Sequence, residues 1–181
     1  GEGKDTLVGG ADKDEIWGGA GNDSIWGGSD AAGTDDGDNV LGGGAGKDTL
    51  KVTTGAAVTL TGGDGIDTFD LSGYTGTVGG AATITDFAKG ETIKFVSNAA
   101  ADFNSGKVTL IAESTFTEYV NEAMKVASAN GANTHGVAWF QFNNNTFVVQ
   151  NMAADNTFND GTDIIVKITG AVDLSASSFN E

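Results

Sequence analysis

Aspartate recurs in a fixed local context within the first 70 residues. Asp5, Asp14 and Asp23 lie nine residues apart, and Asp48 and Asp67 repeat the same context further along. Each aspartate follows a glycine-rich stretch and precedes a large apolar residue two positions later. Carboxylates and exposed turn carbonyls are hard oxygen ligands, of which calcium takes about six to eight. The pattern therefore predicts calcium binding.

The aspartates belong to a nonapeptide of the form G-G-x-G-x-D-x-U-x, where U is a large apolar residue. Three copies are complete, at residues 18–26, 43–51 and 62–70. Because internal repeats of fixed period indicate a solenoid, we expect each unit to be one structural element that stacks on its neighbours.

Four other units keep the register with departures from the pattern. Residues 1–8 lack the first position, and residues 9–17 carry Asp12 in place of the third glycine. Residues 27–41 contain six extra residues and place Asp38 at the aspartate position, whereas residues 52–61 have lost the aspartate. The array of seven units is therefore predicted to contain interrupted sites.

Each unit divides into a turn and a short strand. Glycine permits the positive-φ conformations and close backbone packing of the turn, and the D-x-U-x segment forms a strand whose U side chain points inward. The predicted interior of the solenoid consists of Leu7, Ile16, Ile25, Val40, Leu50 and Phe69.

Two units complete one coil, so that alternate aspartates stack in ladders about 4.8 Å apart. One edge carries Asp5, Asp23, Asp48 and Asp67, and the other carries Asp14 and Asp38 before the ladder breaks. Stacked carboxylates repel one another, and a calcium ion between successive turns removes that repulsion. We expect three ions on the first edge and at least one on the second, about four or more in all. Glycine and aspartate also favour turns in a metal-free solenoid, but turn propensity does not place aspartate at the sixth position of six units.

These units resemble the RTX repeats, the calcium-binding nonapeptides of proteins exported by type I secretion. The resemblance implies a mainly β fold, a right-handed parallel β-roll over residues 1–78, in which calcium is bound through the aspartates and the carbonyls of the glycine turns. The implied ligands are Asp5, Asp12, Asp14, Asp23, Asp38, Asp48, Asp67 and Asp86, with Gly1, Gly3, Gly19, Gly21, Gly44, Gly46, Gly63 and Gly65.

Residues 79–93 resemble the segment that often closes an RTX array, with Glu91 where aspartate is usual. Asp86 in this segment either ligates a last ion or turns the chain into the cap, since aspartate is a common turn residue. Residues 79–181 are predicted to form a small α+β domain that caps the roll and carries the secretion signal.

The cap is predicted to contain one helix and an antiparallel patch. Thr115 and Glu118 form a capping box ahead of a helix that stops near Asn130. Residues 137–142, 146–150 and 163–168 are expected strands. The loop of residues 151–163 resembles a degenerate calcium loop, but an ordinary surface turn is the favoured interpretation. The tail, residues 174–181, resembles the uncleaved export signal of a type I substrate.

The charge and composition limit the partners. With 25 Asp and Glu against 9 Lys and Arg the net charge is −16, which disfavours binding to nucleic acid or anionic membranes. No cysteine is present, and no apolar run is long enough to insert into a membrane. The single histidine, His135, lies in no catalytic motif, so we expect no enzyme.

We therefore expect a non-catalytic calcium-dependent folding and export module, whose partners are calcium ions and the type I secretion machinery. Self-association or binding to cell-surface components is a further candidate interaction. The expected location is extracellular or on the cell surface, reached without an N-terminal signal peptide. Because Gly1 already lies inside a repeat, we expect residues upstream of it. The expected parent is a surface-layer protein or a large adhesin; the alternative is a secreted protease or lipase whose catalytic domain precedes this region.

Overall fold

The structure is a computed structural model that describes residues 1–28, 38–53, 57–74, 79–95, 103–128, 135–153 and 155–175. These residues form twelve strands and a helix. The strands are β1 (Thr6–Val8), β2 (Glu15–Ala20), β3 (Ser24–Trp26), β4 (Val40–Ala45), β5 (Thr49–Lys51), β6 (Thr59–Asp64), β7 (Thr68–Asp70), β8 (Ala82–Ile84), β9 (Thr92–Lys94), β10 (Val137–Phe142), β11 (Asn145–Gln150) and β12 (Ile164–Ile168), and the helix is α1 (Phe116–Ser128).

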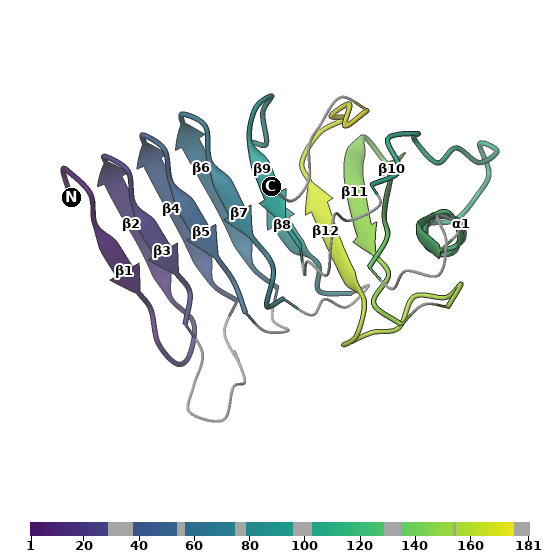
Figure 1. The fold of residues 1–181 in the computed structure, drawn as a ribbon, viewed down its shortest axis with the longest axis horizontal. Coiled ribbons are helices and arrows are strands. Elements are labelled where there is room, and N and C mark those ends of the chain that lie inside the picture. The colour runs from purple at the N-terminus through teal and green to yellow at the C-terminus, as the bar shows by residue number, and fades with distance from the viewer. Residues whose placement is uncertain are drawn as a thin grey trace.

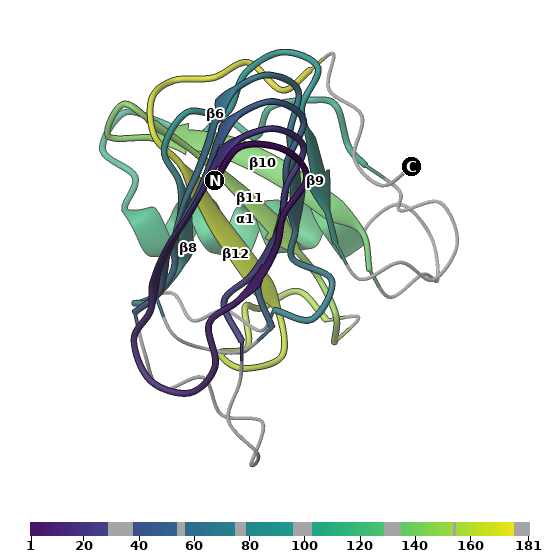
Figure 2. The same ribbon diagram turned by 90° about the vertical axis from the view of Figure 1, so that its left-hand side faces the viewer.

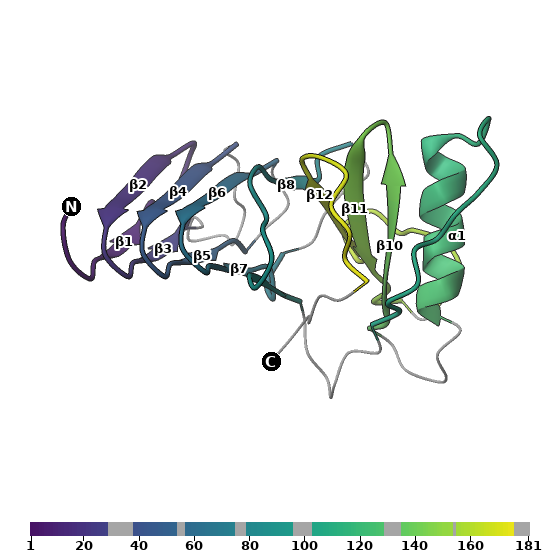
Figure 3. The same cartoon turned by 90° about the horizontal axis from the view of Figure 1, so that it is seen from above.

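The first nine strands alternate between two sheets. One sheet has the order β1-β3-β5-β7-β9 and the other the order β10-β11-β12-β8-β6-β4-β2. All pairs among these nine strands are parallel and in register, so that Ile25 of β3 aligns with Leu7 of β1 and Leu50 of β5. Figures 1 and 3 show the two rows of strands stacked along the long axis of the molecule. The predicted fold class, mainly β with the parallel sheets of a β-roll, an antiparallel patch and one helix, is confirmed.

The interior of the roll consists of the U side chains of both sheets. Ile25, Leu50 and Phe69 are fully buried, as predicted, while Leu7 and Ile16 in the first coil are partly buried and pack against the same cluster. The prediction for Val40 is wrong, because Leu41 pairs with Ile16 and is fully buried, whereas Val40 is half-buried. Figure 2 views the roll from its N-terminal end, where the coils overlie one another.

The parallel pairing continues past residue 78. Strand β8 pairs with β6, and β9 pairs with β7, in the register of the earlier coils. The predicted division between residues 78 and 79 stays a prediction, but both sheets cross it. The closing segment therefore forms a further coil of the roll.

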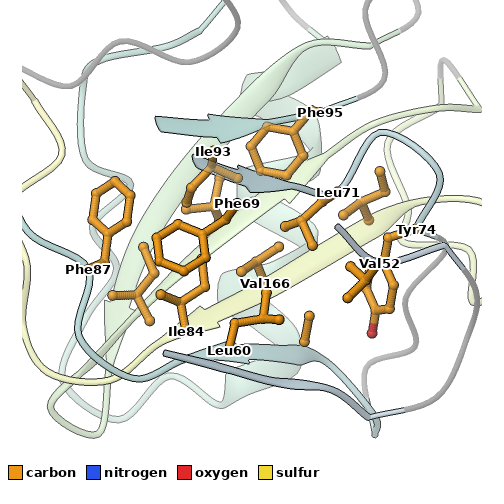
Figure 4. Close-up of a cluster of buried hydrophobic side chains, with 14 of the residues drawn as sticks. Val52, Leu60, Phe69, Leu71, Tyr74, Ile84, Phe87, Ile93, Phe95 and Val166 are labelled. Carbon is orange, nitrogen blue, oxygen red and sulfur yellow. The ribbon is translucent and has the colours of Figure 1, made fainter. Parts of the chain in front are cut away.

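The cap continues one of these sheets. Strand β12 pairs in parallel with β8, placing Val166 beside Ala82, and β11 and β10 follow in antiparallel order. One face of this patch closes the end of the roll, as Figure 4 shows for Val166 among Leu60, Phe69 and Ile84. The opposite face packs under α1 (Figure 3).

Helix α1 begins at the predicted capping box. The backbone N–H of Thr115 donates to the Glu118 carboxylate at 2.7 Å, and the Glu118 N–H donates to the Thr115 hydroxyl at 3.3 Å. These two bonds satisfy orphan donors of the first turn. The side chains of Val120, Ala123, Met124 and Ala127 are buried and form the apolar face of the helix. The predicted stop near Asn130 lies outside the described residues.

The remaining predicted elements of the cap are present. The three strands lie within one residue of their predicted bounds. The loop before β12 is organised by Asp163, which is fully buried and accepts the backbone N–H groups of Met152 and Asn159, each at 2.7 Å. Most of the predicted export tail, residues 176–181, lies outside the described residues. Within the described part of the chain, no helix has the length and apolarity needed to cross a membrane.

Candidate metal centre

The turns of the roll lie along two edges that differ in composition. On the first, the carboxylate edge, the turns end at Asp5, Asp23, Asp48, Asp67 and Glu91, each of which precedes a strand of the five-stranded sheet. On the second, the mixed edge, the equivalent positions hold Asp14, Asn39 and Val58, which precede β2, β4 and β6, and Ala82, which is the first residue of β8. We call these positions the ladder positions.

Adjacent ladder aspartates are joined by hydrogen bonds from backbone to side chain. The N–H of Asp5 donates to Asp23 Oδ1 at 2.8 Å, that of Asp23 to Asp48 Oδ1 at 2.7 Å, and that of Asp48 to Asp67 Oδ1 at 2.8 Å. These bonds hold one oxygen of each carboxylate between two coils. The predicted ladder Asp5–Asp23–Asp48–Asp67 is thus brought together.

The second carboxylate oxygen of Asp23, Asp48 and Asp67 has no hydrogen-bond partner among the residues that the structure describes. Asp23, Asp48 and Asp67 are 3 %, 1 % and 1 % exposed, and the Oδ2 atom of each is buried without a hydrogen bond; Asp14 Oδ2 on the mixed edge shares this condition. A buried carboxylate oxygen without a partner is costly, because the lost hydration is not replaced. A cation bound beside each of these four oxygens would compensate this cost.

The glycine turns leave room for that cation. A Cβ atom built on Gly43 falls 2.6 Å from the carbonyl oxygen of Gly62 and closer still to Asp48 Oδ2. On Gly18 it falls 2.7 Å from the Gly43 carbonyl oxygen and again closer to Asp23 Oδ2. These separations are comparable to calcium–oxygen distances of about 2.3 to 2.6 Å. We call this space, between the first glycine of one turn and the next turn of the stack, the cradle; a side chain on the glycine would fill it.

The predicted glycines line up beside the cradles. Gly19, Gly44 and Gly63 lie at positive φ, and so do Gly21, Gly46 and Gly65. A Cβ on any of these six glycines would collide with the carbonyl oxygen of the glycine in the preceding turn. In the first coil, these oxygens belong to Gly1 and Gly3. All eight predicted glycines therefore form two columns of closely stacked carbonyls, a packing that only glycine permits.

Burial and neighbouring charges raise the pKa values of two ladder carboxyl groups. Burial raises the pKa of Asp48, and the charges of Asp67 and Asp23 raise it further. Burial likewise raises the pKa of Asp67, with the Asp86 charge adding to it. Both shifts show that the ionised ladder is destabilised until positive charge is supplied.

The placement of Asp38 was predicted wrongly. Glu15 pairs with Val40 and Ile16 with Leu41, so Asn39 occupies the ladder position, and its Oδ1 accepts the N–H of Asp14 at 2.7 Å. Asp38 is exposed. Both registers fit the local sequence, but burial of Leu41 selects the observed one. Counting back from the complete unit that starts at Gly43 would have shown that Gly42 ends the preceding unit and Asn39 is its sixth residue.

The closing segment contributes two more carboxyl groups beside Asp67. Thr92 pairs with Thr68, which puts Glu91 at the next ladder position, where it is 5 % exposed. Burial raises the pKa of Glu91 to about 7, and the charges of Asp67 and Asp86 add to this. We had not counted Glu91 among the ligands, although residues 91–94 (ETIK) closely repeat residues 48–51 (DTLK).

Asp86 binds the turn that precedes it in the stack. Its two oxygens accept the backbone N–H groups of Gly62 and Gly63 at 3.0 and 2.8 Å.

Asp5 and Asp12 differ from the inner aspartates. Asp5 is only half-buried, and Asp12 is an exposed turn residue with φ of 68°.

Side chains alone do not complete a site. Among the described residues, no three histidine, cysteine, aspartate or glutamate side chains are grouped so as to hold a metal. Each cradle instead offers one or two carboxylates together with turn carbonyls. Such a ligand set suits calcium, which accepts backbone carbonyls in flexible geometry.

Comparison with known families agrees with this geometry. The model of the RTX calcium-binding nonapeptide repeat matches in four copies, over residues 1–31 and 34–51. The N-terminal part of this chain therefore carries RTX calcium-binding repeats, which are typical of extracellular proteins exported by type I secretion. A comparison with curated proteins finds no match to the chain.

Proposed function

We propose that this chain is a non-catalytic module that folds when it binds calcium and that accompanies a larger protein through type I export. The observation that carries the proposal is the set of four buried carboxylate oxygens without a partner, on Asp14, Asp23, Asp48 and Asp67. Each marks one ion, so the proposed number is four. Calcium supplies the positive charge and the high coordination number that these oxygens and the turn carbonyls need.

The ions add a further link between successive turns, which hydrogen bonds from backbone to ladder side chains already join. In the cradle of Asp23, the ion contacts Asp23 Oδ2 and the Gly43 carbonyl, with the Asp48 carboxylate alongside. The cradle of Asp48 repeats this arrangement with Gly62 and Asp67. The last cradle, at Gly62, presents Asp67 Oδ2, and Glu91 occupies the next ladder position in the stack. Each ion thereby cross-links two successive turns of the roll.

Coupling of calcium to folding follows from the charge. The net charge of −16 favours an expanded chain when no cation is bound. A folded site does not exist in the unfolded chain, so the free energy of binding adds directly to the free energy of folding. At low cytosolic calcium the repeats stay unfolded and can pass an export channel. At the higher calcium concentrations outside the cell they fold.

The proposed partners are calcium and the type I secretion machinery, and the proposed location is extracellular or the cell surface. We assign no catalysis to this chain. The proposed parent is a surface-layer protein or a large adhesin; the tail of a secreted protease or lipase is the alternative. Calcium-dependent self-association, measured by light scattering, supports the first and its absence supports the second.

The test is far-UV circular dichroism during calcium titration and subsequent chelation. We expect β-sheet signal to develop cooperatively with calcium, to disappear in excess chelator, and not to develop with magnesium, which requires a smaller octahedral site. A chain equally folded in excess chelator and in calcium would refute the proposal.

A further inference from the structure

The two edges of the roll present different ligand sets to calcium. On the carboxylate edge, each cradle is flanked by two acidic residues of successive turns, for example Asp23 with Asp48 and Asp48 with Asp67. Calcium affinity depends on the number of charged ligands as well as on their rigidity. The carboxylate edge therefore offers two negative charges at each step.

At its cradle, the mixed edge offers one negative charge from the described ladder positions. The Oδ2 atom of Asp14 and the Gly27 carbonyl oxygen both approach the Cβ position of Gly9, as their counterparts do in the other cradles. The neighbour of Asp14 in the stack is Asn39, whose Oδ1 accepts the Asp14 N–H at 2.7 Å. A neutral amide thus stands where the carboxylate edge has a second carboxylate.

Among the described residues, the mixed edge offers no cradle after this one. Asn39 Nδ2 lies 3.0 Å from the Cβ position of Gly27, at the place where a ladder aspartate presents its Oδ2. An amide nitrogen donates hydrogen bonds and does not ligate calcium. The next ladder position is Val58, which is 1 % exposed and belongs to the apolar core. The Asp14 cradle is therefore isolated on its edge.

We infer that the roll has two classes of calcium site: three on the carboxylate edge and a weaker one at Asp14, which is set apart by Asn39. This inference rests on the proposed function and adds to it that the ions bind in two steps. The loss of one charged ligand is expected to weaken the Asp14 site by roughly tenfold or more. On rising calcium the carboxylate edge fills first, and the turn of residues 9–14 is tied to Gly27 last.

The test is a calcium-binding isotherm of the whole chain, measured by calorimetry or flow dialysis, for the native protein and three variants. The native protein is expected to bind in two phases. Asn39→Asp supplies the missing charge, so the weak phase tightens by roughly tenfold and merges with the strong one. Asp14→Asn removes the weak phase and leaves the strong phase unchanged.

Asn22→Asp is the matched control. Asn22 is exposed, and its Oδ1 accepts the backbone N–H of Lys47 at 2.8 Å, as Asn39 does for Asp14. The substitution adds the same charge with the same local hydrogen bond, but outside a cradle. It is expected to leave the weak phase within about twofold, since exposed charges are screened.

Several outcomes overturn the inference. A single class of site in the native protein, an unchanged weak phase in Asn39→Asp, or an equal shift in Asn22→Asp each contradicts it. Failure of Asn39→Asp to fold in saturating calcium, seen by circular dichroism, also contradicts it, because an added carboxylate facing calcium must stabilise the roll. Four equivalent sites leave the proposed function intact, whereas absence of calcium binding removes that function itself.

Discussion

Replacing Asp48 by asparagine isolates the charge of one ladder position. The amide oxygen of Asp48→Asn retains the ability to accept the Asp23 N–H, now 2.7 Å from Oδ1, and the side chain keeps its size. What changes is the buried Oδ2, which has no partner in the protein and becomes an NH₂ group. We expect the effect on stability to have opposite signs with and without calcium.

Without calcium, the substitution is expected to stabilise the fold. Asp48 has Asp23 and Asp67 one strand spacing away on either side, about 5 Å. Each pair repels by about 1 kcal/mol even at the dielectric constant of water, and burial adds a cost that is visible in the raised pKa of Asp48. Removal of the charge is therefore worth about 1 to 2 kcal/mol in favour of the metal-free fold.

With calcium, the same substitution is expected to destabilise the fold. Asp48 lies at its own cradle through Oδ2 and next to the cradle of Asp23 through Oδ1. An ion at a concentration one hundred times its Kd stabilises by about 2.7 kcal/mol. Impairment of both ions then costs about 3 to 5 kcal/mol, which exceeds the gain from reduced repulsion.

The measurement is urea unfolding followed by far-UV circular dichroism, in saturating calcium and in excess chelator. In chelator, where the native chain is expected to unfold readily, the amplitude of the β signal serves as the readout. Asp64→Asn is the control, because Asp64 is an exposed residue of a neighbouring turn and loses the same charge. If Asp48→Asn stabilises the protein in calcium, or shifts it no more than Asp64→Asn does, the assignment of the cradles is wrong.

Three further predictions concern the pH response, the glycine columns and the cap. Burial raises the pKa of Glu91 from 4.5 to about 7, so the metal-free fold is stabilised at low pH and loses that stability, up to about 3 kcal/mol, as the pH rises from about 4.5 through 7; the amplitude of the β signal in chelator should rise on acidification, and less so in Glu91→Gln. Gly46→Ala places a Cβ against the Gly21 carbonyl at φ of 139° and should cost about 3 kcal/mol or more in calcium, whereas Gly161→Ala, at φ of 79° in open space, should cost about 1 to 2 kcal/mol. Thr115→Ala should lower the free energy of unfolding in urea by about 1 kcal/mol through loss of the helix cap without changing the calcium midpoint; a calcium midpoint that moves with it would show that cap and sites are coupled.

Local patterns in the sequence predicted most of the elements. The strands of the repeats follow from the nonapeptide period, and the helix follows from its capping box and apolar face, since both signals span only a few residues. The register after the insertion was not predicted, because residues 38–41 (DNVL) fit two alignments with apolar residues at either U position. Burial of Leu41 decides between them, and burial depends on the whole roll.

The strand pairing that joins the cap to the roll was also not predictable from the sequence. Strand β12 pairs with β8 although Ile168 and Ile84 are far apart in the chain. A local sequence period does not predict such a pairing, because parallel neighbouring strands need not be close in sequence. The continuation of the ladder to Glu91 could have been predicted, because residues 91–94 closely repeat residues 48–51. The longer turn before Glu91 made this register hard to recognise.

A comparison of the two edges shows that burial alone does not explain why aspartate occupies the ladder positions. Asp48 and Asp67 on one edge and Val58 and Ala82 on the other hold equivalent positions, and all four are at most 1 % exposed. The position therefore accepts an apolar side chain, which carries no desolvation cost. An ionised carboxylate at the same burial is stable only when a cation compensates it. Turn propensity does not account for this difference, because the preference of aspartate for turns does not require a buried oxygen without a partner. The repeated aspartates are thus explained by the ion that they bind, and the apolar residues mark the turns of the mixed edge that pack into the core without one.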